Sequence, residues 1–288
     1  MQDRSISRAG LACLLILSEL CHSALARGIS EQEFEILREA NELATSGQYD
    51  AAEASVRDLL ATSGISDSGR ETALNTLGFI LYQKDDIPGA LETYKQLLNQ
   101  DGVSRELRSQ TAYTIAQLSS VSDDHEAALE YLMEYLEEAT PTPANYVFLA
   151  QTYYSLDRYA ELITPLEKGI ALAEETRAPT KEAWWILLLF AGREARDPAM
   201  VARANDALME HWPSEKRAAD AVKSQLLVGD IEYTDAAMRR YVDRYPAGEL
   251  LTPMHLATMS ADSDSIRPLV GRGEAIDGPG GLDRTPQQ

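Results

Sequence analysis

The chain has 288 residues, of which 44% are hydrophobic and 25% are charged, an ordinary balance for a globular protein. Its formal net charge of −20 argues against nucleic acid or an anionic membrane surface as a partner, because both require clustered lysine and arginine. A mostly solvated acidic surface accounts for this charge. A functional acidic patch that meets a basic partner is the alternative.

Residues 1–26 have the features of an export signal. Arg4 and Arg8 form a basic n-region, residues 9–20 are largely apolar, and an A-x-A cleavage site follows at residues 24–26. The apolar run is too short to span a membrane comfortably. We therefore expect a mature chain that begins near Arg27 and resides in the periplasm, without a membrane span.

Both cysteines of the chain, Cys13 and Cys21, fall inside this signal. The expected mature chain has no thiol and no disulfide, which suits an oxidising exported compartment. The alternative is a lipoprotein acylated on Cys21. Leu20 disfavours it, because a small residue normally precedes such a cysteine.

The stretch TLGFILYQKDDIPGALETY (residues 76–94) predicts two closely packed helices. Gly78 and Ala90 are small, as expected where two helix backbones approach, and the larger residues around them fill the space between helix pairs. A break lies between the two segments, where Asp86 can cap the second helix and Pro88 suits its first turn.

The same pattern recurs along the chain. Taking the small residue of the first helix as an anchor, the copies centre on Ala40, Gly78, Ala116, Ala150 and, less well, Leu189. A helix–turn–helix repeat with a period near 34 residues and small residues at fixed places is the tetratricopeptide-repeat (TPR) signature. The predicted fold is an all-α, TPR-type right-handed superhelical solenoid.

The spacings between anchors are 38, 38, 34 and 39 residues. The two spacings of 38 predict longer loops between repeats, at residues 62–70 and 99–107. A sixth, degenerate pair is expected around Ala221–Val228 and Ala236–Tyr245, and Leu250–Met259 is a candidate for one last capping helix. We therefore expect a repeat domain at 27–259 with about five to six hairpins, followed by a disordered tail at 260–288.

No catalytic pattern is found in the sequence. The expected mature chain has three histidines, His125, His211 and His255, and none belongs to an H-E-x-x-H motif. Phosphate-binding and dinucleotide-binding glycine loops are also missing from the sequence. We expect neither enzyme activity nor a cofactor or metal, and we interpret the histidines as structural.

The repeats predict a groove instead, because the first helix of each TPR pair lines the concave face of the stack. The residues offset from the packing positions are aromatic or amide-bearing, with almost no positive charge, which favours an extended or helical peptide over a basic clamp for a C-terminal carboxylate. The alternative is that these aromatic residues pack against a neighbouring repeat or the C-terminal segment. The candidate contact residues are Asn75, Phe79, Tyr82, Tyr113, Gln117, Gln151, Tyr154, Phe190 and Arg193.

The middle of the chain resembles one particular group of TPR proteins. Residues 113–118 (YTIAQL), Pro141 and Pro143, residues 149–154 (LAQTYY) and residues 165–168 (PLEK) are similar to the periplasmic TPR proteins associated with bacterial TonB energy-transduction systems. The resemblance covers roughly residues 35–192. It implies an accessory role beside the inner-membrane TonB, ExbB and ExbD proteins in uptake of iron complexes. A TPR adaptor for another envelope machine, in secretion or outer-membrane assembly, is the second interpretation, since the fold alone fixes no partner.

Overall fold

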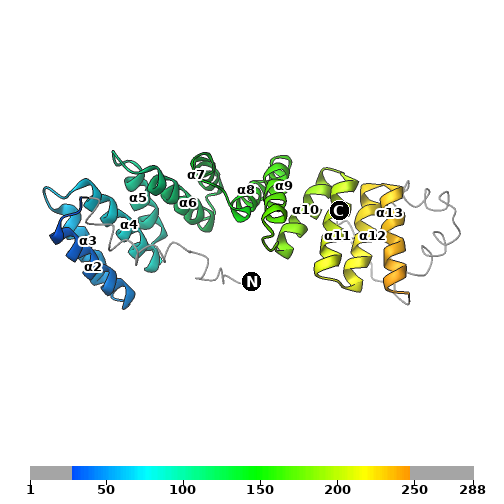
Figure 1. Ribbon diagram of the computed structural model, residues 1–288, viewed down its shortest axis with the longest axis horizontal. Helices are drawn as coiled ribbons and strands as arrows, with labels where there is room; N and C mark the ends of the chain where they lie inside the picture. Colours follow the sequence, from blue (N-terminus) through cyan, green and yellow to red (C-terminus); the bar gives the residue numbers. More distant parts are fainter. Residues whose placement is uncertain (1–27, 247–288) are drawn as a thin grey trace, which may run out of the picture. The chain divides into compact units, whose positions relative to one another are not determined.

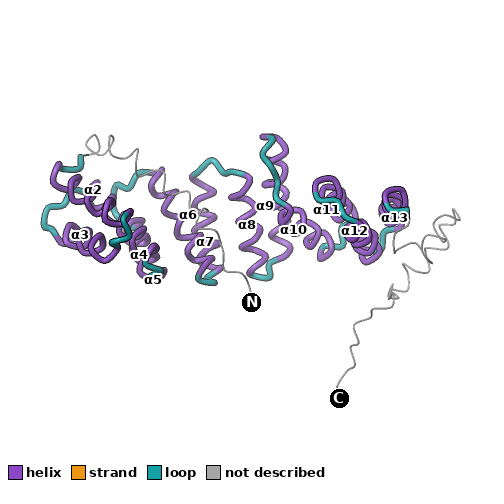
Figure 2. Tube along the Cα trace, turned by 90° about the horizontal axis from the view of Figure 1, so that it is seen from below, coloured by secondary structure: helices purple, strands orange, loops and turns teal. Residues whose placement is uncertain are grey.

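The computed structural model describes residues 28–246, which form α-helices joined by short loops and contain no strand (Figure 2). The expected signal at 1–26 and the expected tail at 260–288 lie outside the described residues, as does the candidate capping segment at 250–259. The described part divides between Thr140 and Pro141 into an N-terminal unit and a C-terminal unit, each treated by itself.

The N-terminal unit contains three helical hairpins, each made of two neighbouring helices (Figure 1). Their helices are α2 (Glu31–Thr45) with α3 (Tyr49–Ala61), α4 (Asp67–Gln83) with α5 (Ile87–Leu98), and α6 (Arg105–Val121) with α7 (His125–Glu138).

The C-terminal unit also contains three hairpins. Their helices are α8 (Pro143–Ser155) with α9 (Tyr159–Thr176), α10 (Glu182–Glu194) with α11 (Pro198–His211), and α12 (Glu215–Val228) with α13 (Ile231–Arg244). The degenerate sixth pair of the sequence is therefore a complete hairpin. The twelve described helices confirm the predicted all-α class.

Every hairpin turns at a residue with left-handed backbone, seven positions after its anchor. These residues are Gly47, Asp85, Asp123, Asp157, Arg196 and Gly229, with φ between 52° and 84°. In the first five turns the next residue donates its N–H to the carbonyl five positions back, as Asp86 does to Leu81 at 2.9 Å. This bond is that of a Schellman motif, which satisfies carbonyls at the end of the first helix. The turns place all five sequence anchors in one register and assign Val222 as the sixth.

The second helix of most hairpins starts on an aspartate that caps it. The side chains of Asp86, Asp124, Asp197 and Asp230 each accept the backbone N–H three residues on, at 3.0 to 3.2 Å. Asp86 followed by Pro88 confirms the predicted break. The cap satisfies one of the otherwise unpaired donors at the start of a helix.

The close approach that the sequence predicts is present within the hairpins. Ala40, Ala116 and Ala150 are fully buried, as are Ala52, Ala90 and Ala128 on the second helices. A Cβ atom at Gly78 would lie 2.7 Å from Cζ of Tyr94, so the ring occupies the space that any other residue would need. Leu189 is only partly buried, which agrees with its poorer match to the pattern.

The loops predicted at 62–70 and 99–107 are wrong over part of their length. α4 already begins at Asp67 and α6 at Arg105, and each has 17 residues where α8 has 13. Ser66 and Ser104 cap these helices by accepting the N–H of Gly69 and Leu107, at 2.9 and 3.2 Å. The four extra residues of a 38-residue spacing therefore lengthen the first helix by about one turn.

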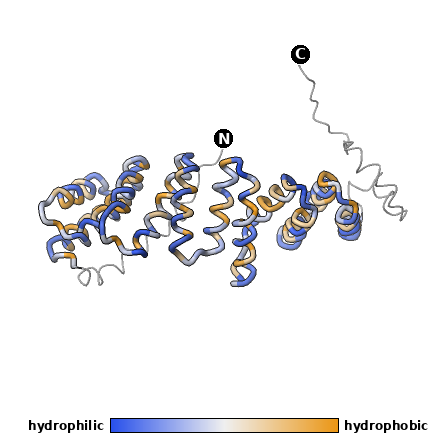
Figure 3. Tube along the Cα trace, turned by 90° about the horizontal axis from the view of Figure 1, so that it is seen from above, coloured by the Kyte–Doolittle hydropathy of each residue, from blue (hydrophilic) through white to orange (hydrophobic). Residues whose placement is uncertain are grey.

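Apolar and polar residues are interspersed along the helices (Figure 3), and the core is built from the buried apolar ones. The N-terminal unit has one continuous core that includes Leu77, Ile80, Leu97 and Ile115. The C-terminal unit has a core from α8 to α11, around Leu166 and Leu188. A smaller core lies under α12 and α13, around Val222 and Met238.

Glu33 joins the starts of the first two hairpins through its buried carboxylate, and its side chain is only 6% exposed. The carboxylate accepts the N–H of Ser30 at 2.8 Å, the N–H of Ser66 at 2.6 Å and the hydroxyl of Ser66 at 2.8 Å. Burial raises the pKa of Glu33, but the hydrogen bonds from Ser66 and Ser30 together lower it by more, so the net pKa lies below the ordinary value.

The contact between Gly78 and the ring of Tyr94 predicts that Gly78→Ala destabilises the chain by about 1–3 kcal/mol, because the buried ring must shift. Urea-unfolding midpoints measure the change. In a Tyr94→Leu background the same alanine should be neutral or stabilising, since alanine favours a helix over glycine by about 1 kcal/mol. Equal losses in both backgrounds would contradict the close-approach argument.

The lowered pKa of Glu33 predicts a pH-dependent contribution to stability. The folded state favours the charged carboxylate, so its stabilisation is complete above the ordinary glutamate pKa and is lost as the pH falls through the lowered value. Glu33→Gln should cost about 1–3 kcal/mol at neutral pH, and the difference from wild type should shrink below about pH 4. Unfolding midpoints across this range measure it. As a control, Glu31→Gln, on the exposed side of the same turn, should cost less than half as much. If the stability difference between wild type and Glu33→Gln did not change with pH, the carboxylate of Glu33 would not be the stabilising group.

Candidate partner-binding face

The sequence-predicted contact residues lie on the first helices of four hairpins, at equivalent distances from the turns. We call this set the first-helix face and describe it separately in each unit. In the N-terminal unit it comprises Asn75, Phe79 and Tyr82 on α4, with Tyr113 and Gln117 on α6. In the C-terminal unit it comprises Gln151 and Tyr154 on α8, with Phe190 and Arg193 on α10.

In the N-terminal unit all five residues are half-buried. Tyr82 packs against the core of the unit. The ring of Tyr113 lies 4.7 Å from that of Tyr135 on α7, centroid to centroid, and burial raises the pKa of Tyr135. The structure thus joins Tyr113 to a residue outside the predicted set, and its ring contributes to packing within its own hairpin.

In the C-terminal unit the predicted residues are more open. Gln151 and Arg193 are exposed, and Tyr154 is 44% exposed. The Tyr154 ring meets that of Phe190 edge to face, with centroids 5.1 Å apart. The structure therefore brings together two predicted residues that lie 36 positions apart in the sequence and on different hairpins.

Tyr159, at the start of α9, completes this cluster and was missed from the sequence. Its ring centroid lies 5.8 Å from that of Tyr154 and 5.1 Å from that of Phe190. We call these three rings the aromatic cluster. Edge-to-face pairs stabilise one another through their quadrupoles, so the cluster is held in place while Tyr154 stays accessible.

The turn before α9 positions Tyr159. Asp157 has left-handed backbone, with φ of 55°, and its carboxylate accepts the phenol O–H of Tyr159. This hydrogen bond, with smaller contributions from burial and from the nearby acidic charges of Asp157 and Glu194, raises the pKa of Tyr159 to about 12. The phenol is protonated over the physiological range, as an ordinary tyrosine also is, and its hydrogen bond to Asp157 orients the ring. The signal for it in the sequence is a tyrosine two places after a turn aspartate.

Two of the predicted structural histidines lie within the described residues. His125 is the first residue of α7, and His211 ends α11, where its ring meets that of Trp212 at 5.5 Å. His255 lies outside the described residues. Among residues 28–246, no group of three or more histidine, aspartate or glutamate side chains is placed to hold a metal ion. No helix in the same span is long and apolar enough to cross a membrane.

Comparisons with solved structures decide the fold. A tetratricopeptide repeat protein from Parabacteroides merdae superposes with a TM-score of 0.52, at 14% sequence identity, over 75% of this chain and 79% of that one. The C-terminal part of a TPR repeat-containing protein from Cytophaga hutchinsonii superposes with a TM-score of 0.51, at 15% identity, over 80% and 90% of the two chains. The chain has the tetratricopeptide-repeat fold.

A double mutant of MamA RS-1 also superposes, with a TM-score of 0.50 at 15% identity, over 63% of this chain and 95% of that one. No family model matches the sequence, and no curated protein matches it. At these identities the likeness concerns the backbone architecture, and it leaves the partner open.

Proposed function

We propose that this TPR protein is a non-enzymatic scaffold that holds a segment of another protein on its first-helix face. The observation that carries the proposal is the aromatic cluster in the C-terminal unit, where Tyr154 is 44% exposed beside Phe190 and Tyr159. A large ring held open to solvent by two other rings is suited to be a binding anchor, because it loses little conformational entropy on contact.

The chemistry around the cluster favours a peptide held along its backbone and apolar side chains. Gln151 lies one helical turn before Tyr154 and offers both an amide donor and an amide acceptor. Arg193 is the single cation of the first-helix face as defined here, so the face lacks the paired cations that would capture a free carboxylate. An internal extended or helical segment fits this combination better than a chain terminus does.

The identity of the partner rests on the sequence. The export signal expected at residues 1–26 favours the periplasm, and the resemblance over roughly residues 35–192 favours a protein of the TonB system. Within the proposal, the chain is an accessory component that binds TonB, ExbB, ExbD or a receptor coupled to them, in uptake of iron complexes.

Site-specific photocrosslinking in cells tests both parts of the proposal. A photoreactive residue replaces the exposed Gln151, and another replaces Lys168, which is exposed on α9, a second helix. We expect mass spectrometry to identify a TonB-system protein crosslinked to position 151. The same protein should not be crosslinked to position 168. A specific adduct with a secretion or assembly protein would overturn the assigned partner, and equal adducts at both positions would overturn the assigned face.

The aromatic cluster predicts that Tyr154→Ala weakens binding of the captured partner about thirtyfold, the loss typical of a hot spot worth about 2 kcal/mol. The melting temperature should change little, because the ring is 44% exposed. The matched control is Tyr233→Ala on α13, where the tyrosine is 36% exposed and lies outside the first-helix face. Affinities come from titration with the crosslinked segment as a synthetic peptide. Equal effects of the two variants would refute the anchor role of Tyr154.

A further inference from the structure

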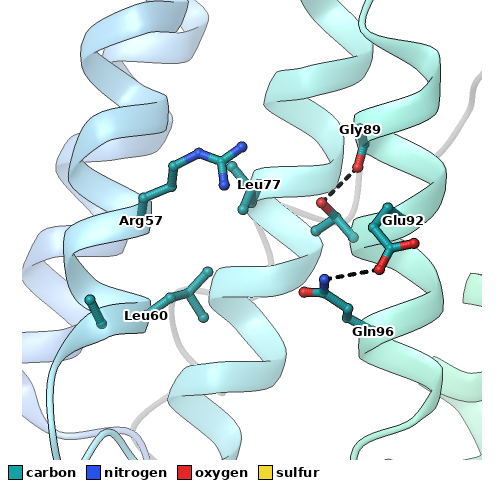
Figure 4. A pocket seen from close by; sticks show the side chains of 8 residues that line it. Arg57, Leu60, Leu77, Gly89, Glu92 and Gln96 are labelled. Carbon is teal, nitrogen blue, oxygen red and sulfur yellow. Dashed lines mark hydrogen bonds between the residues drawn. The ribbon is translucent and has the colours of Figure 1, made fainter.

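A furrow lies between the second helices of successive hairpins, with the intervening first helix as its floor. In the N-terminal unit it runs between α3 and α5 over α4, with a volume of about 410 Å³. Arg57 and Leu60 line one wall, Leu77 lies at the floor, and Glu92 and Gln96 line the other wall (Figure 4). We call it the α4 furrow.

The C-terminal unit has a furrow in the same register, between α11 and α13 over α12, with a volume of about 460 Å³. We call it the α12 furrow. Counted from the hairpin turns, several of its lining residues occupy the places of lining residues in the α4 furrow. Asp206 stands in the place of Arg57, Met209 in that of Leu60, Ala221 in that of Leu77, and Arg240 in that of Gln96.

The floor of the α12 furrow is built from smaller residues. Ala221 stands where α4 has Leu77, and Ala218 stands where α4 has Leu74. On the wall, Ala237 stands in the place of Thr93. At the same place in the N-terminal unit, α7 has Tyr131, whose ring lies 6.0 Å from Nζ of Lys95. The replacements by alanine leave room for a guest over α12.

Two buried amides line the α12 furrow at places where the other hairpins are mostly apolar. Asn205, only 6% exposed, takes the place of Val56, Tyr94 and Leu132 in the N-terminal unit, and its Nδ2 donates to Oγ of Ser224 at 2.9 Å. Gln225, 1% exposed, takes the place of Leu81 on α4. Polar groups at core positions break the pattern of the repeat and lower its stability, which is typical of functional sites.

Gln225 has an unsatisfied acceptor. Its Nε2 donates to the carbonyl oxygen of Pro198 at 3.2 Å, which fixes the amide. Its Oε1 is buried and has no hydrogen-bond partner within residues 28–246. A buried carbonyl oxygen without a donor is costly and is rarely left so in folded proteins. A ligand that supplies an N–H or O–H group would satisfy it.

We propose that the α12 furrow binds a small neutral molecule with an apolar, ring-sized body and one N–H or O–H donor directed at Oε1 of Gln225. The volume lies in the range of small-molecule sites, and the alanines with Met209 and Tyr241 supply apolar walls. Three acidic residues of the lining, Asp206, Glu210 and Asp243, stand beside two arginines, Arg240 and Arg244. The charges nearly balance, which favours a neutral guest over an ion. This site lies on the second-helix side of the hairpins and is independent of the first-helix face.

Indole and benzofuran are the probes, because the two have nearly the same shape and only indole carries an N–H donor. Each is titrated into the full chain while amide signals of Ala218, Ala221 and Gln225 are followed by NMR. We expect saturable shifts with both probes. Indole should bind about fivefold more tightly, the ratio that one neutral hydrogen bond typically gives.

Two substitutions taken from α4 separate the parts of the site. Gln225→Leu introduces the residue found at Leu81 and should abolish the preference for indole while both probes still bind. Ala221→Leu introduces the residue found at Leu77 and should remove binding of both probes by filling the floor. Ala236→Leu, on the exposed side of α13, adds the same side chain outside the furrow and should bind as wild type does.

Circular dichroism establishes that each variant is folded before it is titrated. The proposal is overturned if indole produces no saturable shifts in the wild-type furrow. It is also overturned if a folded Ala221→Leu variant binds indole as wild type does, or if Gln225→Leu keeps the indole preference. Should Ala221→Leu not fold, the loss of preference in Gln225→Leu decides between the outcomes.

Discussion

The whole array depends on one turn in which a left-handed residue closes the first helix and reverses the chain. Asp85, Asp123, Asp157 and Arg196 adopt this backbone although they carry side chains. The conformation costs a non-glycine residue roughly 1–2 kcal/mol. The bond back to the carbonyl five positions earlier offsets part of this cost, and the aspartate that often follows caps the next helix. Because the turn fixes which residues of two helices face each other, it also fixes the small residues at the crossing.

Because the turn recurs with the repeat, the residues that it places at the helix crossings could be predicted from the sequence. Gly78, Ala116 and Ala150 were identified because small residues at a crossing recur with the repeat, and the turns confirm their register. The helix lengths were less predictable. A serine in a polar stretch can sit in a loop or cap a helix, and only the hydrogen bonds of Ser66 and Ser104 show the second. Tyr159 was missed for a different reason. The predicted contact residues were taken from the first helices alone, and Tyr159 lies on a second helix, α9.

Some of the acidic residues form ion pairs between helices of the array. Several of the few cations tie neighbouring hairpins or helices together: Lys84 contacts Asp50 and Glu53, Arg217 contacts Glu182, and Arg240 contacts Asp206. These partners lie 31 to 35 residues apart, about one repeat. Each exposed pair contributes at most about 1 kcal/mol. These pairs leave the formal net charge of −20 unchanged, because each cation still neutralises one carboxylate. The remaining excess of acidic residues favours a neutral or basic partner.

A repeat fold allows a second site without cost to the first. Each hairpin packs mainly on its neighbours, so a change in one hairpin leaves the turns of the others intact. In the aromatic cluster Tyr154 is 44% exposed and Tyr159 packs against the core of the C-terminal unit, so the cluster adds to that core without replacing a hydrophobic residue in it. The α12 furrow differs, because Asn205 and Gln225 replace hydrophobic residues at core positions. Such a replacement weakens the hairpin that carries it, and the small core under α12 and α13 has little stability to spare. A buried acceptor kept at that position is therefore easier to understand as a binding group than as a packing group.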